Sequence, residues 1–149
     1  MAISIVDWEN ELSFAKKDEK VGIKIATLSE SQDKGTYITS LPPGSSVTPH
    51  YHEEGDEEYH IISGSGVIRL LPVNHMHTEF KMVCKYVTAK NSFVIPANVI
   101  HQLINNSATE ELILIFSCPL SHLKEDRIII ENKEFRIDEN INHLKTRCL

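Results

Sequence analysis

The sequence predicts an all-β fold, and two observations support this prediction. Short stretches in which apolar and polar residues alternate recur along the chain, as at Val21, Ile23 and Ile25. This period of two is typical of half-buried β-strands. Turn-forming residues such as the Pro-Pro-Gly sequence at 42–44 separate the stretches, at intervals of about eight to twelve residues. Many short strands joined by such turns are typical of a β-sandwich or a β-barrel.

The expected strands follow one another along most of the chain. They comprise residues 21–28, 36–41, 47–52, 57–63, 67–71, 79–87, 93–95, 101–105 and 111–118. The stretch 111–118 is strongly apolar, so we expect it in the middle of a sheet. Residues 47–52 and 57–63 are expected to pair with each other as a hairpin.

The two ends of the chain are expected to form short extensions of the barrel. Residues 1–20 predict an arm followed by a turn of helix, and residues 119–125 predict a second helical turn. Residues 127–130 and 134–137 predict a hairpin that lies outside the barrel, followed by a polar tail.

The length of 149 residues suits one domain with a sizeable core. We therefore expect a single domain over residues 1–149, with a barrel core at about 21–118 and a C-terminal hairpin and tail over 119–149. The content of 41% hydrophobic and 24% charged residues is that of an ordinary globular protein.

Charge and cysteine content restrict the expected partners and location. The net charge is −6 and no cluster of Lys or Arg occurs, which argues against nucleic acid and anionic membrane as partners. No apolar run is long enough to span a membrane, and the N-terminus lacks a signal-peptide pattern. Cys84, Cys118 and Cys148 are widely spaced, which indicates reduced thiols and a cytoplasmic location.

Residues 44–64 carry the most informative pattern of polar side chains. His50 and His52 are separated by one residue, and this spacing points both imidazoles to the same face of a β-strand. Glu57 follows at the start of the next expected strand. Core packing does not require two imidazoles and a carboxylate on one face, whereas a metal ion does. Imidazole nitrogen and carboxylate oxygen suit Zn, Fe, Mn, Ni or Co.

This pattern resembles the first sequence motif of the cupin superfamily. The motif reads Gly, five residues, His-x-His, four residues, Glu, six residues, Gly. It is matched here by Gly44, His50, His52, Glu57 and Gly64.

The second cupin motif is similar to residues 90–105. Pro96, His101 and Asn105 match the motif, whereas Lys90 and Asn98 stand where the motif has glycine. Asparagine tolerates a left-handed backbone better than most residues, so the departure at Asn98 is mild. The turn at Lys90 departs further from the motif, but it does not involve a ligand.

The resemblance implies a small jelly-roll β-barrel, or double-stranded β-helix, with short N- and C-terminal extensions. It also implies one divalent metal ion, either Fe, Zn, Mn or Ni, held by His50, His52, Glu57 and His101. Such a ligand set leaves about two positions of a six-coordinate ion open, as catalytic sites do. Replacement of His122 is not expected to affect metal content.

Tyr59 shares the face of Glu57, because it lies two positions further along the expected strand. In cupin-type dimethylsulfoniopropionate lyases the same position holds a tyrosine that resembles a catalytic base. The resemblance thus implies a catalytic role for Tyr59, with a core tyrosine as the alternative. A nearby cation would lower the pKa of its phenol. The residues expected to line the pocket with Tyr59 are Thr48, Ile61, Leu103 and Phe116.

Other polar residues near the motifs are expected to lie outside the site. Glu58 and His60 lie an odd number of positions after Glu57, so they should be on the opposite face of the strand and point outwards. His75 and His77 repeat the His-x-His spacing in an expected loop, and a role at the pocket mouth is open.

Two functions remain open from the sequence. The first is a metal-dependent cupin enzyme that acts on a small organic substrate, as a dioxygenase or as a metal-assisted lyase or isomerase. The second is a non-catalytic cupin that binds or senses a small molecule. No arginine is assigned to the site, which argues against a large phosphorylated substrate. We also expect a homodimer, with Trp8 and residues 127–137 as candidate contacts.

Overall fold

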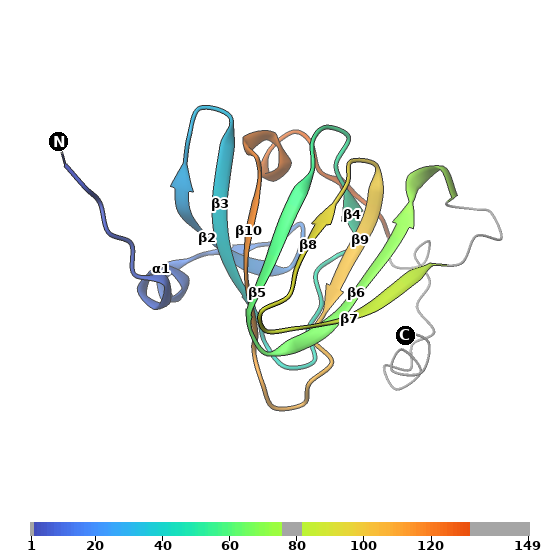
Figure 1. Cartoon of the computed structure of the whole chain (residues 1–149), viewed down its shortest axis with the longest axis horizontal. Coiled ribbons are helices and arrows are strands. Elements are labelled where there is room, and N and C mark those ends of the chain that lie inside the picture. Colours follow the sequence, from blue (N-terminus) through green and yellow to red (C-terminus); the bar gives the residue numbers. More distant parts are fainter. Residues whose placement is uncertain (1, 76–81, 132–149) are drawn as a thin grey trace.

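The computed structural model describes residues 2–75 and 82–131, whose strands form two antiparallel sheets (Figure 1). Sheet A has the strand order β1 (Lys17–Asp18), β2 (Ile23–Glu30), β3 (Lys34–Leu41), β10 (Leu112–Pro119), β5 (Glu57–Ser63) and β8 (Ser92–Ile95). Sheet B has the order β11 (Ile128–Ile129), β4 (His50–Tyr51), β9 (Val99–Ile104), β6 (Ser65–Pro72) and β7 (Val83–Thr88). The helical segments are α1 (Trp8–Phe14), η1 (Val73–His75) and η2 (Leu120–Leu123). This arrangement confirms the predicted all-β class.

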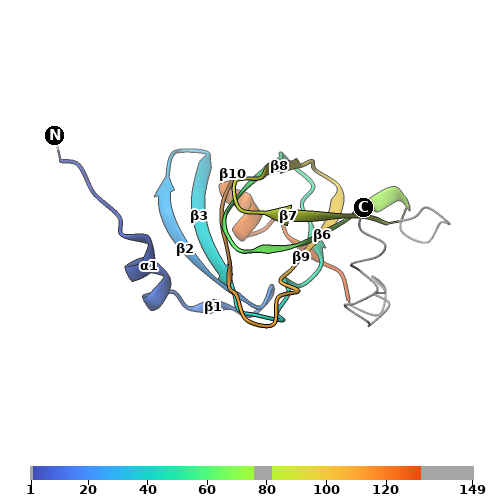
Figure 2. The same cartoon turned by 60° about the horizontal axis from the view of Figure 1, so that its bottom comes forward.

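The two sheets enclose one main hydrophobic core (Figure 2). Sheet A contributes Leu41 and Leu114, and sheet B contributes Ile68 and Leu103. Each fully buried side chain of this size stabilises the fold by about 1.5–3 kcal/mol. β10 lies between β3 and β5 and buries every second residue, which confirms its predicted central place.

The predicted hairpin between residues 47–52 and 57–63 is wrong. β4 belongs to sheet B, where His50 lies opposite His101, whereas β5 belongs to sheet A and pairs with β8 and β10. The loop at residues 52–56 therefore carries the chain from one sheet to the other. Strand parity fixes which face each residue occupies, but it does not identify the pairing partner.

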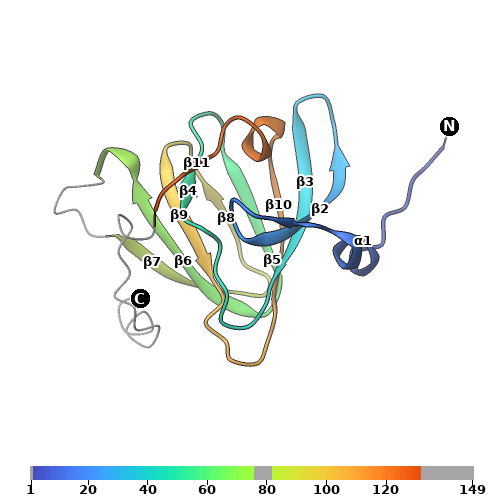
Figure 3. The same cartoon turned by 180° about the vertical axis from the view of Figure 1, so that it is seen from behind.

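The prediction of a C-terminal hairpin outside the barrel is also wrong for its first strand. β11 pairs with β4 at the edge of sheet B, with Ile128 opposite Tyr51 (Figure 3). The predicted second strand at 134–137 and the tail lie outside the described residues. The helical turns predicted before β1 and after β10 are confirmed as α1 and η2.

Asn105 anchors the end of β9. Its buried side-chain amide donates to the carbonyls of Leu41 and Glu110, and its side-chain oxygen accepts from the backbone of Ser107. The predicted structural role of this motif residue is thus confirmed.

The two positions at which the second motif lacks glycine keep a left-handed backbone. Lys90 has a φ of 74° and Asn98 a φ of 61°. The backbone N–H of Asn98 donates to the carbonyl of His52 over 2.7 Å, so this turn reaches the candidate metal ligands. The turns therefore persist without their glycines, at a cost in backbone strain.

Lys90→Gly is expected to stabilise the protein by about 1 kcal/mol, because a non-glycine residue pays about 1–2 kcal/mol in this conformation. Urea unfolding of the variant and the wild type measures the difference. Asn98→Gly should stabilise the protein less than Lys90→Gly, since asparagine tolerates the left-handed backbone better than lysine. A Lys90→Gly variant that is no more stable than the wild type would contradict the expectation.

The cysteines agree only in part with the expectation of reduced thiols. Cys118 is a free, buried thiol, and burial raises its pKa far above the ordinary value. Cys84, in contrast, is disulfide-bonded, so the expectation is wrong at this position. Cys148 lies outside the described residues. Among the described residues, every helix is too short or too polar to cross a membrane.

Candidate metal centre

The structure brings His50, His52, Glu57 and His101 together in its interior. All four side chains are buried, and one donor atom from each lies within 4.8 Å of the others. His50 and His101 face each other across β4 and β9, and His52 follows β4 directly. Glu57 opens β5 and approaches from sheet A. The four residues that the sequence singled out thus converge from both sheets.

Backbone carbonyls orient the three imidazole rings. The Nδ1 atoms of His50 and His101 donate to the carbonyls of Thr48 and Val99, over 2.7 and 3.0 Å. The Nδ1 atom of His52 donates to the carbonyl of Asp126. Each bond places the proton on Nδ1 and leaves a lone pair on Nε2, which is how proteins prepare histidine to bind a metal.

The donor atoms at the centre lack ordinary hydrogen-bond partners among residues 2–75 and 82–131. This holds for the Nε2 atoms of His52 and His101 and for Oε2 of Glu57. His52 Nε2 lies 2.9 Å from Glu57 Oε2. A proton on Nε2 can bridge these two atoms in the metal-free protein, and a metal ion that binds both would take its place. The set fits a divalent transition metal, whose identity the donors do not select.

The ionisation states of the ligands favour metal binding at neutral pH. Burial lowers the pKa of His50 and His101, so both rings are neutral. Burial alone would raise the pKa of Glu57, but contacts with His122 and His52 hold it well below its usual value. The centre thus offers neutral imidazoles and a carboxylate, which are the forms that coordinate.

The metal-free protein is expected to lose stability as the pH falls from about 6.5 to 5. Because the pKa values of His50 and His101 are lowered in the folded state, the unfolded chain binds more protons in this range. Each ring then lowers the free energy of unfolding by up to about 1.4 kcal/mol per pH unit. Urea unfolding of chelator-treated protein at the two pH values measures the loss.

The pKa of one neighbouring histidine, His122, shifts in the opposite direction. Burial opposes protonation of His122, but contacts with Glu57 and the carbonyl of Glu54 raise its pKa. The protonated form of His122 stabilises the folded state, and this contribution is already complete below pH 6.5, the pKa of the unfolded chain. It therefore does not offset the stability lost through His50 and His101. Equal stability at pH 6.5 and pH 5 would contradict the expectation.

The segment after β10 forms a second layer around the ligands that the sequence did not predict. The His122 ring stacks on His52 with centroids 3.8 Å apart, and its Nδ1 atom lies 3.6 Å from Glu57 Oε2. The carboxylate of Asp126 accepts hydrogen bonds from the backbone N–H groups of Glu53 and Glu54. His122 therefore borders the centre, and it is not a suitable control for metal loss.

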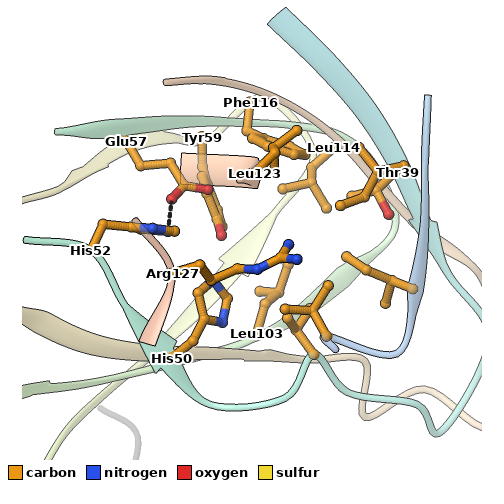
Figure 4. Close-up of a pocket in the computed structure, with 14 residues that line it drawn as sticks. Thr39, His50, His52, Glu57, Tyr59, Leu103, Leu114, Phe116, Leu123 and Arg127 are labelled. Atoms are coloured by element: carbon orange, nitrogen blue, oxygen red, sulfur yellow. Dashed lines mark ion pairs between the residues drawn. The ribbon is translucent and has the colours of Figure 1, made fainter. Parts of the chain in front are cut away.

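Beside the ligands lies a small cavity of about 20 Å³, which is room for about one water molecule. His50, His52 and Glu57 line one part of it, and the hydroxyl of Tyr59 points into it (Figure 4). Its other walls are mostly apolar and comprise Val21, Ile23, Ile25, Thr39, Val47, Leu103, Leu114, Phe116 and Leu123.

The predicted walls are recovered in part. Tyr59, Leu103 and Phe116 line the cavity, whereas Ile61 belongs to the main core and Thr48 is not among the lining residues. Burial and the charge of Glu57 raise the pKa of Tyr59 well above 10. Its hydroxyl is therefore protonated in the metal-free protein, which differs from the phenolate expected beside a cation.

The expectation that no arginine belongs to the site is wrong. Arg127 extends into the cavity from the segment between η2 and β11 (Figure 4). Its Nη2 atom lies 2.9 Å from Oδ2 of Asp18 in β1. No local sequence pattern marked Arg127, because the segment reaches the site through contacts with distant parts of the chain, among them the pairing of β11 with β4.

The remaining described polar residues near the motifs lie outside the cavity. His60 and Glu58 lie on the outer side of β5, 2.9 Å apart and both partly exposed. His75 ends η1 and is not among the residues that line the cavity. His77 lies outside the described residues.

Comparisons with known proteins agree with this fold. CapF from Staphylococcus aureus has a TM-score of 0.66 at 21% identity over 79% of this chain and 32% of CapF. An uncharacterised protein with a double-stranded β-helix domain from Klebsiella pneumoniae has a TM-score of 0.62 at 14% identity, over 87% of this chain and 99% of that protein. KdgF from Halomonas sp. has a TM-score of 0.51 at 18% identity, over 65% of this chain and 79% of KdgF.

These similarities show the fold alone, and this chain spans about a third of the length of CapF. No match is found among curated proteins. The sequence model of the Cupin family, however, matches residues 25–138. This range contains both motifs, the four converging side chains and the segment after β10. The chain therefore belongs to the cupin family.

Proposed function

We propose that this cupin is a metal-dependent enzyme that acts on a small organic substrate, as a metal-assisted lyase or isomerase. One observation carries the proposal: four buried donor atoms meet beside a cavity that also receives the hydroxyl of Tyr59. A divalent cation held by His50, His52, Glu57 and His101 would supply Lewis-acid polarisation of a substrate oxygen.

The chain's own groups suit proton transfer on a bound substrate. The hydroxyl of Tyr59 is protonated, so it can donate a hydrogen bond or a proton to a substrate oxygen and later recover it. Apolar walls that include Leu103, Leu114 and Phe116 surround the cavity, and electrostatic interactions are stronger in such a low-dielectric environment. Proton transfer is the step that lyases and isomerases share, and this favours them over a dioxygenase.

A second function, non-catalytic binding or sensing of a small molecule, could use the same centre and cavity. About 20 Å³ admits neither an organic substrate nor an organic ligand unless a side chain moves. The solved structure of CapF with the inhibitor 3-isopropenyl-tropolone is a small-molecule complex of a protein with a similar fold, and it supports either function.

Metal content and turnover test the proposal. The purified full chain should contain about one transition metal per molecule by elemental analysis. Metal-free protein reloaded with Zn, Mn or Ni should convert a member of a panel of small organic acids, alcohols and sugars, followed by NMR. Oxygen consumption that depends on Fe(II) would point to a dioxygenase instead. Metal and ligand binding without turnover under any of these metals would favour the binding protein.

We also propose that the protein is a homodimer. Ile3, Ile5 and Phe14 are largely exposed, and Ile5 reaches 92% on an arm that extends away from the barrel (Figures 1 and 3). Such apolar side chains are expected to pack against a second copy. Light scattering should give a dimer mass at micromolar concentration, and Ile3→Ser with Ile5→Ser should shift it towards the monomer. A monomer mass for the wild type would contradict the proposal.

A further inference from the structure

Among the described residues that line the cavity, Arg127 is the one cationic side chain. Its side chain is only 5% exposed, and its Nε atom has no hydrogen-bond partner among the described residues. The Nη2 atom of Arg127 lies 2.9 Å from Oδ2 of Asp18, whose side chain is 26% exposed. A buried guanidinium with an unused donor is costly, because desolvation is repaid only when its donors are paired.

The geometry of this ion pair leaves room for a second acceptor. The N–H groups of Nε and Nη2 lie on the same edge of a guanidinium and form a fork that matches the two oxygens of a carboxylate. Asp18 pairs with Nη2, and Nε has no hydrogen-bond partner among the described residues, so this edge of the guanidinium is not fully paired. A ligand carboxylate that takes both prongs would complete the pairing of Arg127.

The charges around the cavity favour an anionic ligand. Glu57 is the only acidic residue in the described part of the cavity lining, and it belongs to the candidate metal ligands. With a divalent cation in place, the ion and Arg127 together outweigh the charges of Glu57 and Asp18 by one unit, since +3 meets −2. The other walls are mostly apolar and suit a short hydrocarbon body.

We propose that Arg127 binds the carboxylate of the substrate, and that the substrate is a short-chain organic acid. This inference rests on the proposed function, because it names the substrate class of the same site. In the free protein Asp18 pairs with the guanidinium, and Arg127 and Leu123 are among the side chains that line the small cavity (Figure 4). The entering carboxylate competes with Asp18 for Arg127, and movement of the guanidinium opens the space that the substrate fills.

Binding of a simple acid to the full chain tests the proposal. The probe is butyrate, compared with butyramide, which has a similar shape and no charge. The affinities of both compounds are measured by NMR titration of the zinc-loaded and the metal-free protein. Arg127→Gln should weaken butyrate binding about tenfold or more, because a charge-assisted bidentate pair is lost, and it should leave butyramide unchanged. The control Lys85→Gln removes an exposed positive charge from β7 and should leave both affinities unchanged.

Asp18→Asn separates substrate binding from a purely structural ion pair. If Asp18 competes with the ligand, its loss should strengthen butyrate binding several-fold, the opposite of Arg127→Gln. If the ion pair only fastens the segment to β1, both variants should lower the thermal midpoint and neither should change the ratio of butyrate to butyramide affinity. That outcome would overturn the proposal. Should Arg127→Gln fail to fold, the sign of the Asp18→Asn effect decides.

Metal content of the same samples keeps this proposal separate from the proposed function. Neither Arg127 nor Asp18 is among the candidate ligands, so both variants should keep their zinc. Zinc bound at full occupancy with unchanged butyrate affinity in Arg127→Gln would overturn the role of Arg127 alone. A wild-type protein that binds no metal would instead overturn the proposed enzyme, whatever its affinity for butyrate.

Discussion

His101→Ala is expected to remove most of the bound metal. His101 is buried opposite His50, and its Nε2 atom has no hydrogen-bond partner among the described residues. Loss of an outer-shell partner already weakens metal binding by about 10- to 100-fold, and loss of a ligand should exceed this. His50→Ala and His52→Ala should behave alike. Elemental analysis after dialysis against a weak chelator measures the occupancy.

The matched control for these variants is His60→Ala. His60 lies on the outer side of β5, where it contacts Glu58 and the hydroxyl of Ser92, and it is not among the four converging side chains. Its replacement should leave the metal content unchanged. If all four variants retained as much metal as the wild type, the assignment of the centre would be wrong.

Tyr59→Phe is expected to abolish most turnover while the protein keeps its metal. The substitution retains the buried ring, which packs near Phe93 and Phe116, and removes only the hydroxyl that points into the cavity. Loss of a general acid or base typically lowers turnover by about 100- to 10,000-fold. Steady-state kinetics on the substrate found in the screen, with metal analysis of the same sample, measures the effect.

Two comparisons separate chemistry from packing in this variant. Tyr86→Phe changes an exposed phenol on β7 and should leave turnover unchanged. The thermal midpoint of Tyr59→Phe should stay near that of the wild type, since core packing is kept. Undiminished turnover in Tyr59→Phe would make Tyr59 a wall residue and would assign proton transfer to another group.

The fold class and the four converging side chains could be predicted because their signals are local. Alternation of apolar residues indicates a strand whatever its partner, and the parity of His50 and His52 fixes their common face. The same rule correctly placed Tyr59 on the ligand side and His60 outside. The left-handed turn at Asn98 was predictable from the motif, because asparagine tolerates this backbone, whereas the lysine at position 90 left the other turn open.

The features that were missed depend on contacts between distant parts of the chain. Sequence spacing suggested that residues 47–52 and 57–63 pair, but the two strands lie in different sheets. The polar segment that follows β10 shows no periodicity, so nothing local indicated that His122 stacks on His52 or that Arg127 enters the cavity. Hydrogen bonds with residues 52–54 and the pairing of β11 with β4 bring this segment to the ligands.

The candidate ligands come from both sheets, and this has a consequence for how the protein resists unfolding. Three imidazoles come from β4, the residue after it and β9, and one carboxylate comes from β5. A bound ion would therefore act as a reversible cross-link between the two layers, in addition to side-chain packing and hydrogen bonds such as that of Asn105 to Leu41. Separation of the layers would then require release of the ion first. Metal loading should therefore slow the opening motions that expose the interior to proteases, by an amount set by metal concentration relative to its dissociation constant.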